Sequence, residues 1–458
     1  MHLGHHDADV YRARRLRLAE HLDALPALIP AGAAPARNYL AARYPFRASS
    51  HFLYLIGLPL EAAFALCDGD QCTLFVEPRG ADDALWHGPE PDLEQLAEPC
   101  AVRPLASLSD QIAGRPVATL PAPDPITRAR QAALLGREVT HDRFADDDAR
   151  LADAMIALRL VHDGPAIEGL RRAANATVAA HRAGMAATRP GILEATVRAA
   201  MESVFVSMNM TTSYNSIVTV HGEVLHNESY HRTLGRADLL LADVGAEAQD
   251  GWAGDVTRTW PVSGRFSSTQ RELYEVVLAA QSGAIELVRP GVRYRDVHVR
   301  ACHALAAGLV DLGILHGDPE ELVADGVHAL LFPHGIGHLL GLDVHDMEDL
   351  GDRAGYGPGR TRAEQFGLAA LRLDRDLAPG MAVTIEPGLY IVPAILERED
   401  LRRLAGDRLD RDRLAQFGDV RGIRIEDDVL VTERGSEVLT GAAPKAPEEL
   451  QAQVGTNA

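Results

Sequence analysis

The chain has 458 residues, a length that favours two or three folded units over one. Hydrophobic residues make up 47% of it and charged residues 24%, which is an ordinary globular composition and excludes wholesale disorder. Its 65 acidic residues outnumber its 45 basic residues, and the resulting formal charge of −20 argues against nucleic acid or an anionic membrane as the main partner.

Cysteine usage and the N-terminal sequence indicate the cellular compartment. The four cysteines are Cys67, Cys72, Cys100 and Cys302. They are too few and too scattered for a disulfide framework, so reduced thiols are expected. No apolar core follows a basic N-terminal start and no run of about 18 apolar residues occurs, which predicts a cytoplasmic protein without a membrane span. His2, His5 and His6 are interpreted as part of a solvated terminus rather than as a metal site.

The N-terminal third of the chain has the pattern of an α/β domain. Residues 10–135 alternate helical stretches with short apolar strands, such as residues 64–67 and 72–76, which are joined by the turn Asp68-Gly-Asp70. Residues 146–160 then have a helical period with few glycines or prolines.

A new helix start marks the domain boundary. Asp163-Gly-Pro165 supplies an acidic N-cap and an early proline, so we place one domain at residues 1–162 and a second at 163–458. Within the second domain, residues 179–192 and 279–292 resemble each other at an offset of 100 residues. In both copies a helix ends at Arg-Pro-Gly and another amphipathic helix follows, which predicts a duplicated α/β unit, with chance similarity of Ala-rich helices as the alternative.

Acidic residues occur where apolar side chains are expected. The stretch 238–245 is nearly all apolar, as in a strand buried on both faces, yet it contains Asp243. A buried carboxylate costs several kcal/mol unless it is paired or bound to a metal, so Asp243 requires a cation. The alternating stretch 254–259 is predicted to return as a hairpin strand, which would place Asp255 beside Asp243.

The same conflict recurs twice near the C-terminus. Glu386 lies in the β-branched run 381–388, and Glu426 lies in the run 422–431. Residues two apart share a face of a strand, so Arg424 and Glu426 are expected on one face, where a buried Arg–Glu salt bridge is the alternative to metal binding.

A histidine-rich segment supplies the remaining ligand candidates. His334, His338 and His345 lie in a stretch whose glycines, at 335, 337 and 341, argue against a regular helix and for a close backbone approach. A single buried histidine is more often structural, but four unpaired acids favour an imidazole ligand. Mostly oxygen ligands with one imidazole suit a pair of divalent ions, with Mn²⁺ as the first candidate and Zn²⁺ or Co²⁺ as alternatives. Two ions about 3.5–4 Å apart would hold a bridging hydroxide, which is hydrolytic chemistry.

These motifs together resemble the aminopeptidase P and prolidase family of proline-specific metallopeptidases, which have the pita-bread fold. Leu-Ala-Asp-Val-Gly, Gly-Asp-Val-Thr-Arg-Thr, His-Gly-Ile-Gly-His, Thr-Ile-Glu-Pro-Gly and Arg-Ile-Glu-Asp-Asp occur in the family's order. The resemblance implies that Asp243 binds one metal, that His338 and Glu386 bind the other, and that Asp255 and Glu426 bridge both. It also implies that Glu386 handles the proton of the attacking water, as the chemistry requires.

The resemblance extends to residues around the ligands. It implies that His226 and His345 contact the substrate and the tetrahedral intermediate, and that His334, which we also include among the substrate-binding candidates, stands behind the ligands. Arg424 resembles an arginine that orients a bridging carboxylate. Arg372 resembles an arginine that holds the C-terminal side of the substrate.

The N-terminal domain also resembles the family's, notably over residues 44–57, and the fold class implied for the whole chain is α/β (α+β). His51 stands where some relatives have an aspartate that holds the substrate's N-terminal ammonium from the partner subunit, so we include His51 among the substrate-binding candidates. Asp243 and Asp255 are twelve residues apart where many relatives have eleven, which one extra turn residue would absorb.

Two long segments, 347–371 and 394–420, distinguish the chain from a compact aminopeptidase. Such insertions flank the site in some prolidases, so the resemblance implies that they flank it here, where they could cover the pocket and restrict it to dipeptides. The charged stretch 397–413 is predicted to be a solvated helix, with a subunit contact as the alternative.

The preferred interpretation is a dinuclear Xaa-Pro aminopeptidase that acts on proline-containing peptides. An Xaa-Pro dipeptidase is the first alternative and a non-catalytic peptide-binding module is the second, which is disfavoured because all five ligands are present. A metal-free creatinase-like hydrolase is disfavoured on the same ground, and a methionine aminopeptidase because its catalytic domain lacks the large N-terminal partner. The resemblance implies a homodimer or homotetramer.

Overall fold

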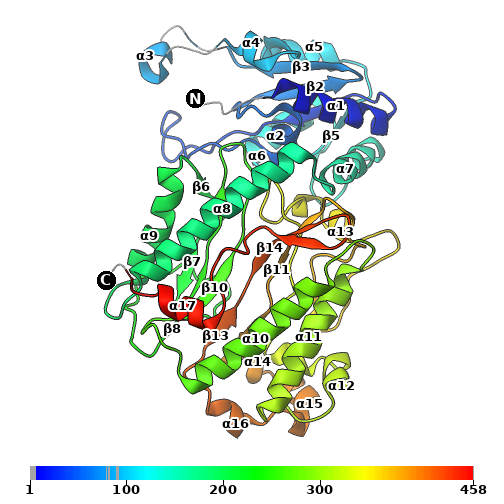
Figure 1. Cartoon of the computed structure of the whole chain (residues 1–458). Coiled ribbons are helices and arrows are strands. Elements are labelled where there is room, and N and C mark those ends of the chain that lie inside the picture. The colour runs from blue at the N-terminus through cyan, green and yellow to red at the C-terminus, as the bar shows by residue number, and fades with distance from the viewer. Residues whose placement is uncertain (1–6, 79, 81–82, 89–91, 457–458) are drawn as a thin grey trace. The chain divides into compact units, whose positions relative to one another are not determined.

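The computed structural model describes residues 7–456 apart from residues 79, 81–82 and 89–91. The chain divides into two compact units, Met1–Leu160 and Val161–Ala458, which we describe separately (Figure 1). The histidines expected in a solvated N-terminus lie outside the described residues. Within the part of the chain that is described, no helix has the length and apolar character needed to cross a membrane.

The N-terminal unit is built around a five-stranded sheet with the order β4-β3-β2-β1-β5. Its strands are β1 (Ala27–Pro30), β2 (Phe64–Asp68), β3 (Gln71–Val76), β4 (Ala101–Pro104) and β5 (Ala118–Thr119). The pairs β1–β2 and β2–β3 are antiparallel, whereas β3–β4 and β1–β5 are parallel. The predicted strands and turn at residues 64–76 are therefore confirmed as the β2–β3 hairpin.

The N-terminal unit also contains helices. They are α1 (Ala8–Leu22), α2 (Ser50–Ile56), α3 (Asp83–His87), α4 (Leu93–Ala97), η1 (Leu105–Ser107), α5 (Leu108–Ile112), α6 (Pro125–Leu135) and α7 (Asp146–Arg159). The predicted helix at 146–160 is confirmed as α7, and its first-turn acids suit the positive end of the helix dipole. Asp148 also anchors α7 to β5, because it accepts a hydrogen bond from the Thr119 N–H at 2.8 Å and pairs with Arg137 at 2.6 Å.

The expectation of reduced cysteines throughout is wrong for one pair. Cys72 and Cys100 form a disulfide, with their Cα atoms 4.6 Å apart. The parallel β3–β4 register brings them together, because Thr73 pairs with Ala101. Cys67 and Cys302 are free and buried.

The C-terminal unit contains two similar pairs of long helices. They are α8 (Gly164–Ala187) with α9 (Glu194–Ser207), and α10 (Ser268–Leu287) with α11 (Tyr294–Asp311). Asp163 caps α8 through a bond from the Ala166 N–H, and Pro165 follows, as predicted. Each pair turns at Arg-Pro-Gly, where Gly191 and Gly291 have φ values of 89° and 81° that favour glycine.

Strands lie between the two helix pairs (Figure 1). They form two three-stranded sheets, β10-β8-β7 and β11-β14-β15, and two strand pairs, β12-β13 and β6-β9. The strands are β6 (Thr211–Thr212), β7 (Ile217–Thr219), β8 (Leu239–Asp243), β9 (Ala246–Glu247), β10 (Thr257–Pro261), β11 (Ala382–Ile385), β12 (Gly388–Tyr390), β13 (Gly422–Arg424), β14 (Asp427–Val431) and β15 (Ser436–Val438).

Short helices complete the C-terminal unit. They are α12 (Pro319–Ala324), η2 (Val327–Leu330), η3 (Glu348–Leu350), α13 (Asp352–Gly355), η4 (Leu368–Ala370), α14 (Pro393–Leu396), α15 (Glu399–Ala405), η5 (Gly406–Arg408), α16 (Arg411–Ala415) and α17 (Pro447–Gln453). The prediction of one solvated helix over 397–413 is wrong. Gly406 has a φ of 55° and Asp410 caps a new helix, so the stretch breaks into α15, η5 and α16, with Leu401 and Leu409 buried.

Candidate metal centre

The acidic residues lie where strands begin, end or break rather than in strand interiors. Asp243 ends the fully buried strand β8, and Asp255 lies two residues before β10, which pairs antiparallel with β8. Glu386 directly follows β11, and Glu426 lies between β13 and β14. The expectation that these acids sit within continuous strands is therefore corrected for all but Asp243, since breaks in the ladders free their side chains to converge.

One cavity of about 480 Å³ collects the predicted site residues. Its wall includes Asp243, Asp255, His338, Glu386, Glu426, His226, His334, His345, Arg372 and Arg424. His51 is not in this wall: it belongs to α2 of the N-terminal unit, is buried, and its Nδ1 lies 3.0 Å from Arg159 Nη1.

The five predicted ligands approach one another closely. Donor atoms of Asp255, His338 and Glu426 all lie within 4.8 Å of one another. His338 Nε2 is 3.4 Å from Asp255 Oδ2 and 3.7 Å from Glu386 Oε1. Asp243 joins the group through the Tyr214 hydroxyl, whose oxygen lies 2.5 Å from Asp243 Oδ1 and 2.6 Å from Asp255 Oδ1, so that its single proton is shared between the two acids.

Backbone contacts fix the orientation of His338. Its Nδ1 lies 3.0 Å from the Leu339 carbonyl oxygen, so Nδ1 carries a proton and Nε2 is the ring nitrogen that faces the carboxylates. Gly337 has a φ of 154°, and a Cβ there would lie 2.2 Å from the Thr384 carbonyl oxygen of β11. The close backbone approach expected of this glycine is confirmed.

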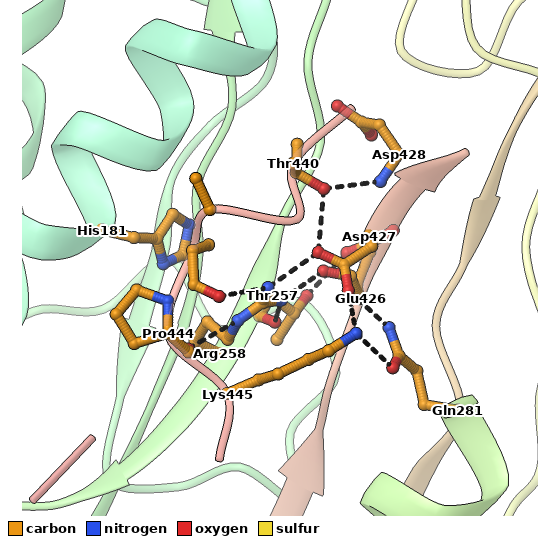
Figure 2. A network of polar contacts seen from close by, with 12 residues as sticks. His181, Thr257, Arg258, Gln281, Glu426, Asp427, Asp428, Thr440, Pro444 and Lys445 are labelled. Atoms are coloured by element: carbon orange, nitrogen blue, oxygen red, sulfur yellow. Dashed lines mark hydrogen bonds and ion pairs between the residues drawn. The ribbon is translucent and has the colours of Figure 1, made fainter. Parts of the chain in front are cut away.

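Arg424 holds several groups around the centre. Its Nη2 donates to Asp243 Oδ2 at 2.5 Å, its Nε to Thr257 Oγ1 at 2.9 Å and its Nη1 to the Tyr390 hydroxyl at 3.0 Å. The Thr257 hydroxyl donates in turn to Glu426 Oε2 at 2.7 Å, a contact drawn in Figure 2. Arg424 thus pairs with Asp243 and reaches Glu426 through Thr257, instead of forming the simple Arg–Glu bridge considered as an alternative.

Burial and mutual repulsion raise the pKa of three of the four acids, Asp243, Glu386 and Glu426. Burial raises the pKa of Glu386 to about 7 and also raises that of Asp243. Burial, reinforced by the neighbouring carboxylates, raises the pKa of Glu426 well above its usual value. Burial is the largest single effect on Asp255 and opposes its ionisation, but the hydrogen bond and charge of His338, together with the Tyr214 hydrogen bond, outweigh it and lower the pKa of Asp255. The pKa of His338 rises to about 9, because that bond and Glu386 outweigh burial.

This electrostatic state is what a cation-binding site requires. His338 and Arg424 carry at most two positive charges, whereas the four buried carboxylates carry up to four negative charges when ionised. The cluster can therefore bind further positive charge. Carboxylate oxygens with one oriented imidazole suit a pair of hard or borderline divalent ions, so the residues fit the metals that the sequence predicts.

The remaining predicted residues lie around this cluster. The rings of His345 and His338 are 4.1 Å apart between centroids. His345 Nδ1 lies 3.2 Å from Glu348 Oε2, which also accepts a hydrogen bond from Arg372 Nη1 at 2.6 Å. His334 Nε2 lies 2.8 Å from the Tyr390 hydroxyl, behind the ligands, and His226 is exposed in the cavity wall.

The two long segments contribute unequally to the cavity. Segment 347–371 supplies Ala370 to the wall, two residues before Arg372. Of segment 394–420, which the structure describes completely, no residue is in the wall. The expectation that both segments flank the site is therefore met only by the first.

Sequence reasoning missed Tyr214, Thr257, Glu348 and Tyr390. Thr257 could have been found, because it lies two residues after Asp255 and so shares its face in an extended segment. The other three had no signal in the sequence, since only the tertiary fold brings their side chains to the ligands.

A second group of donor atoms lies outside the cavity wall. His298, Cys302 and His328 are buried and each has a donor atom within 4.8 Å of the others. His298 Nε2 lies 3.4 Å from Cys302 Sγ, so the imidazole and the thiol contact each other directly. The His298 ring also packs against the ring of Phe332.

Replacing Arg424 by lysine is expected to lower kcat by about 10- to 100-fold. A lysine cannot reproduce three divergent bonds to Asp243, Thr257 and Tyr390 with one ammonium group. Steady-state kinetics with saturating metal measure this effect, with Arg398→Lys, an exposed pair with Asp400, as the control. Full activity of the Arg424→Lys variant would show that the three guanidinium hydrogen bonds of Arg424 are not needed for catalysis.

Comparison with known proteins places this site among related sequences. The model of metallopeptidase family M24 matches residues 168–433, and that of the aminopeptidase P N-terminal domain matches residues 11–114. The Xaa-Pro aminopeptidase of Escherichia coli is 38% identical over 298 residues, which cover 64% of this chain and 59% of that protein. A probable Xaa-Pro aminopeptidase of Ajellomyces capsulatus is 32% identical over 434 residues, covering 89% and 87%. The human Xaa-Pro dipeptidase is 31% identical over 424 residues, covering 89% and 84%.

Solved structures agree over nearly the full length. Aminopeptidase PepP of Pseudomonas aeruginosa has a TM-score of 0.81 with 29% identity, and 98% of each chain is covered. Proline aminopeptidase P II of Yersinia pestis has a TM-score of 0.79 with 30% identity, covering 98% of this chain and 99% of that one. The predicted fold class, an N-terminal α/β domain followed by a pita-bread domain, is confirmed.

Proposed function

Because the chain belongs to metallopeptidase family M24, we propose that it is an Xaa-Pro aminopeptidase that hydrolyses the bond between an N-terminal residue and a following proline. The observation that carries this proposal is the convergence of Asp243, Asp255, His338, Glu386 and Glu426 in one cavity. Relatives named Xaa-Pro aminopeptidases and solved aminopeptidase P structures, one with the inhibitor Pro-Leu, support it.

The proposed metals are two divalent ions, Mn²⁺ first, with Zn²⁺ or Co²⁺ as alternatives. Asp243 would hold one ion and His338 and Glu386 the other, while Asp255 and Glu426 would contact both. Bound ions would lower the pKa of a water molecule and stabilise negative charge on the scissile carbonyl oxygen.

The protein's own groups would move protons and position the peptide. Glu386 would accept a proton from the attacking water and deliver it to the proline nitrogen as the bond breaks, a role suited to a carboxylate whose pKa is raised to about 7 by burial. His226 and His345, in the cavity wall, would donate hydrogen bonds to the substrate and the tetrahedral oxyanion. Arg424 and His334 would hold the ligand shell in place.

Substrate length separates the two peptidase alternatives. The decisive experiment compares an Xaa-Pro dipeptide, an Xaa-Pro-Xaa tripeptide and a longer peptide, using chelator-stripped protein with and without Mn²⁺. Cleavage of the longer peptides establishes an aminopeptidase. Cleavage of the dipeptide alone establishes a dipeptidase. The similarity to the human Xaa-Pro dipeptidase supports this alternative. Absence of metal-dependent hydrolysis would leave a peptide-binding module.

Replacing Arg372 by alanine is expected to raise KM for the dipeptide by about tenfold and KM for the tripeptide and the longer peptide by less than threefold, because only in the dipeptide is the carboxylate of proline itself free. The side chain is exposed and pairs with Glu348, so the fold should tolerate the change. Equal effects on all three substrates would contradict a carboxylate-binding role.

Further proposals concern organisation. Residues 1–162 would control substrate access and oligomerisation and residues 163–458 would carry catalysis, with His51 serving a neighbouring subunit's substrate. Exposed Tyr39, Leu40 and Tyr44 in the N-terminal unit support a homodimer or homotetramer, which light scattering would test. A cytoplasmic location is supported by the free thiols of Cys67 and Cys302 and opposed by the Cys72–Cys100 disulfide, and cell fractionation would test it.

A further inference from the structure

Lys445 is the only lysine in the chain, and the other 44 residues counted as basic are arginines. Its ammonium Nζ donates to Asp427 Oδ2 at 2.8 Å and to Gln281 Oε1 at 2.9 Å, as Figure 2 shows. The lysine side chain is 26% exposed, whereas the Asp427 side chain is completely buried. In a chain that uses arginine everywhere else, the single lysine is therefore engaged with a buried acid.

Asp427 is the residue directly after Glu426, and both of its oxygens are occupied. Oδ1 accepts from Arg258 Nη2 at 2.7 Å and from Thr440 Oγ1 at 2.8 Å. Oδ2 accepts from Gln281 Nε2 at 2.7 Å in addition to Lys445 Nζ. Two cationic side chains, Arg258 and Lys445, therefore flank this one buried acid from opposite oxygens.

Arg258 connects this acid to the metal centre. Its side chain is fully buried, and its Nη1 donates to the backbone carbonyl oxygens of Glu426 and of Thr257, the latter at 3.0 Å. Thr257 in turn donates its hydroxyl to Glu426 Oε2 (Figure 2). The guanidinium thus fixes both the backbone of Glu426 and the residue that orients its carboxylate.

We propose that Lys445 is a positioning residue for the metal centre, which acts through Asp427 and Arg258 to hold the Glu426 carboxylate in its ligating position. This inference rests on the proposed function. A compact ammonium suits this place, because the planar fork of Arg258 already occupies the other oxygen of Asp427 and a second fork would compete for the same space. Without the Lys445 charge, Arg258 alone would balance Asp427, and a shift of its guanidinium toward that acid would weaken its bonds to the backbone oxygens of Glu426 and Thr257.

The test uses the full-length Lys445→Met and Lys445→Arg variants. Lys445→Met is expected to weaken binding of at least one Mn²⁺ ion by about 10- to 100-fold in calorimetric titration and to lower kcat by a similar factor, with KM changed less than about threefold. Lys445→Arg keeps the positive charge but changes the shape of the side chain. Its Mn²⁺ affinity and its kcat should each fall by less than about tenfold. Arg271→Met is the matched control, because it breaks an exposed pair with Glu448 in the same C-terminal region without touching Glu426.

Acetylation of Lys445 provides a second test of the inference, which does not require a substituted chain to fold. Since Lys445 is the only lysine, acetylating the folded wild type modifies this ammonium and the chain's α-amine, and the Lys445→Arg variant treated in the same way controls for all other reactions. Acetylated wild type should lose Mn²⁺ affinity while the treated variant does not change further. Unchanged Mn²⁺ affinity with only a lower melting temperature would overturn the inference, whereas a wild type that binds no Mn²⁺ would overturn the proposed function itself.

Discussion

Replacing Glu426 by glutamine is expected to lower kcat by about a thousandfold, or about 4 kcal/mol of barrier, while leaving the metal-free protein at least as stable as the wild type. Glutamine keeps the shape and can still accept the hydrogen bond from Thr257, but it removes one of the two bridging charges. Burial and the neighbouring carboxylates raise the pKa of Glu426, so its ionised form costs stability at neutral pH when no cation is bound. Thermal unfolding of chelator-treated protein and steady-state kinetics measure the two effects separately.

The control for this variant is Glu437→Gln, which alters an acid on β15 that pairs with Arg171 away from the cavity. It should reduce stability slightly and leave kcat unchanged. A Glu426→Gln enzyme that keeps wild-type activity would contradict the assignment of Glu426 as a ligand.

Removing divalent ions is expected to lower activity more than a hundredfold and to make stability fall as pH rises. In the metal-free protein, burial raises the pKa of Glu386 to about 7 from an ordinary 4.5. Between these values the unfolded chain ionises while the folded protein keeps its proton, so the free energy of unfolding decreases with increasing pH. The raised pKa of His338, about 9, adds a loss of the same sign as the imidazolium deprotonates at higher pH.

Added Mn²⁺ should reverse this dependence, because metal binding requires ionised carboxylates and a neutral imidazole. At a free concentration 100 times the dissociation constant, each site contributes about 2.7 kcal/mol. Melting temperatures at about pH 5 and pH 7.5, with and without Mn²⁺, measure the effect. A metal-induced shift that is larger at the lower pH would contradict a site made of carboxylates.

Local signals predicted much of the fold. The apolar strands around Asp68-Gly-Asp70, the acidic start of α7 and the Asp163 cap of α8 all depend on neighbouring residues. Features that depend on distant pairing were not predictable. The disulfide between Cys72 and Cys100 depends on parallel pairing of β3 with β4 across 28 residues, which the spacing alone does not reveal.

The site was predictable to the extent that its residues violate local rules. Asp243 in a buried strand and Glu386 and Glu426 in β-branched runs are costly unless a cation is near, and that cost is visible in the sequence. Tyr214 and Tyr390 violate no local rule, because a tyrosine suits many environments. Their contacts with Asp243, His334 and Arg424 arise only from tertiary packing.

The two-metal centre underlies every activity proposed for this chain, and crystals soaked with Mn²⁺ test it most directly. Anomalous difference maps should show two peaks about 3.5–4 Å apart, one within ligand distance of Asp243, one within ligand distance of His338 and Glu386, and both within reach of Asp255 and Glu426. A map without Mn²⁺ peaks among these five residues, from protein shown to be folded, would contradict the assignment of this cavity as a dinuclear hydrolytic centre.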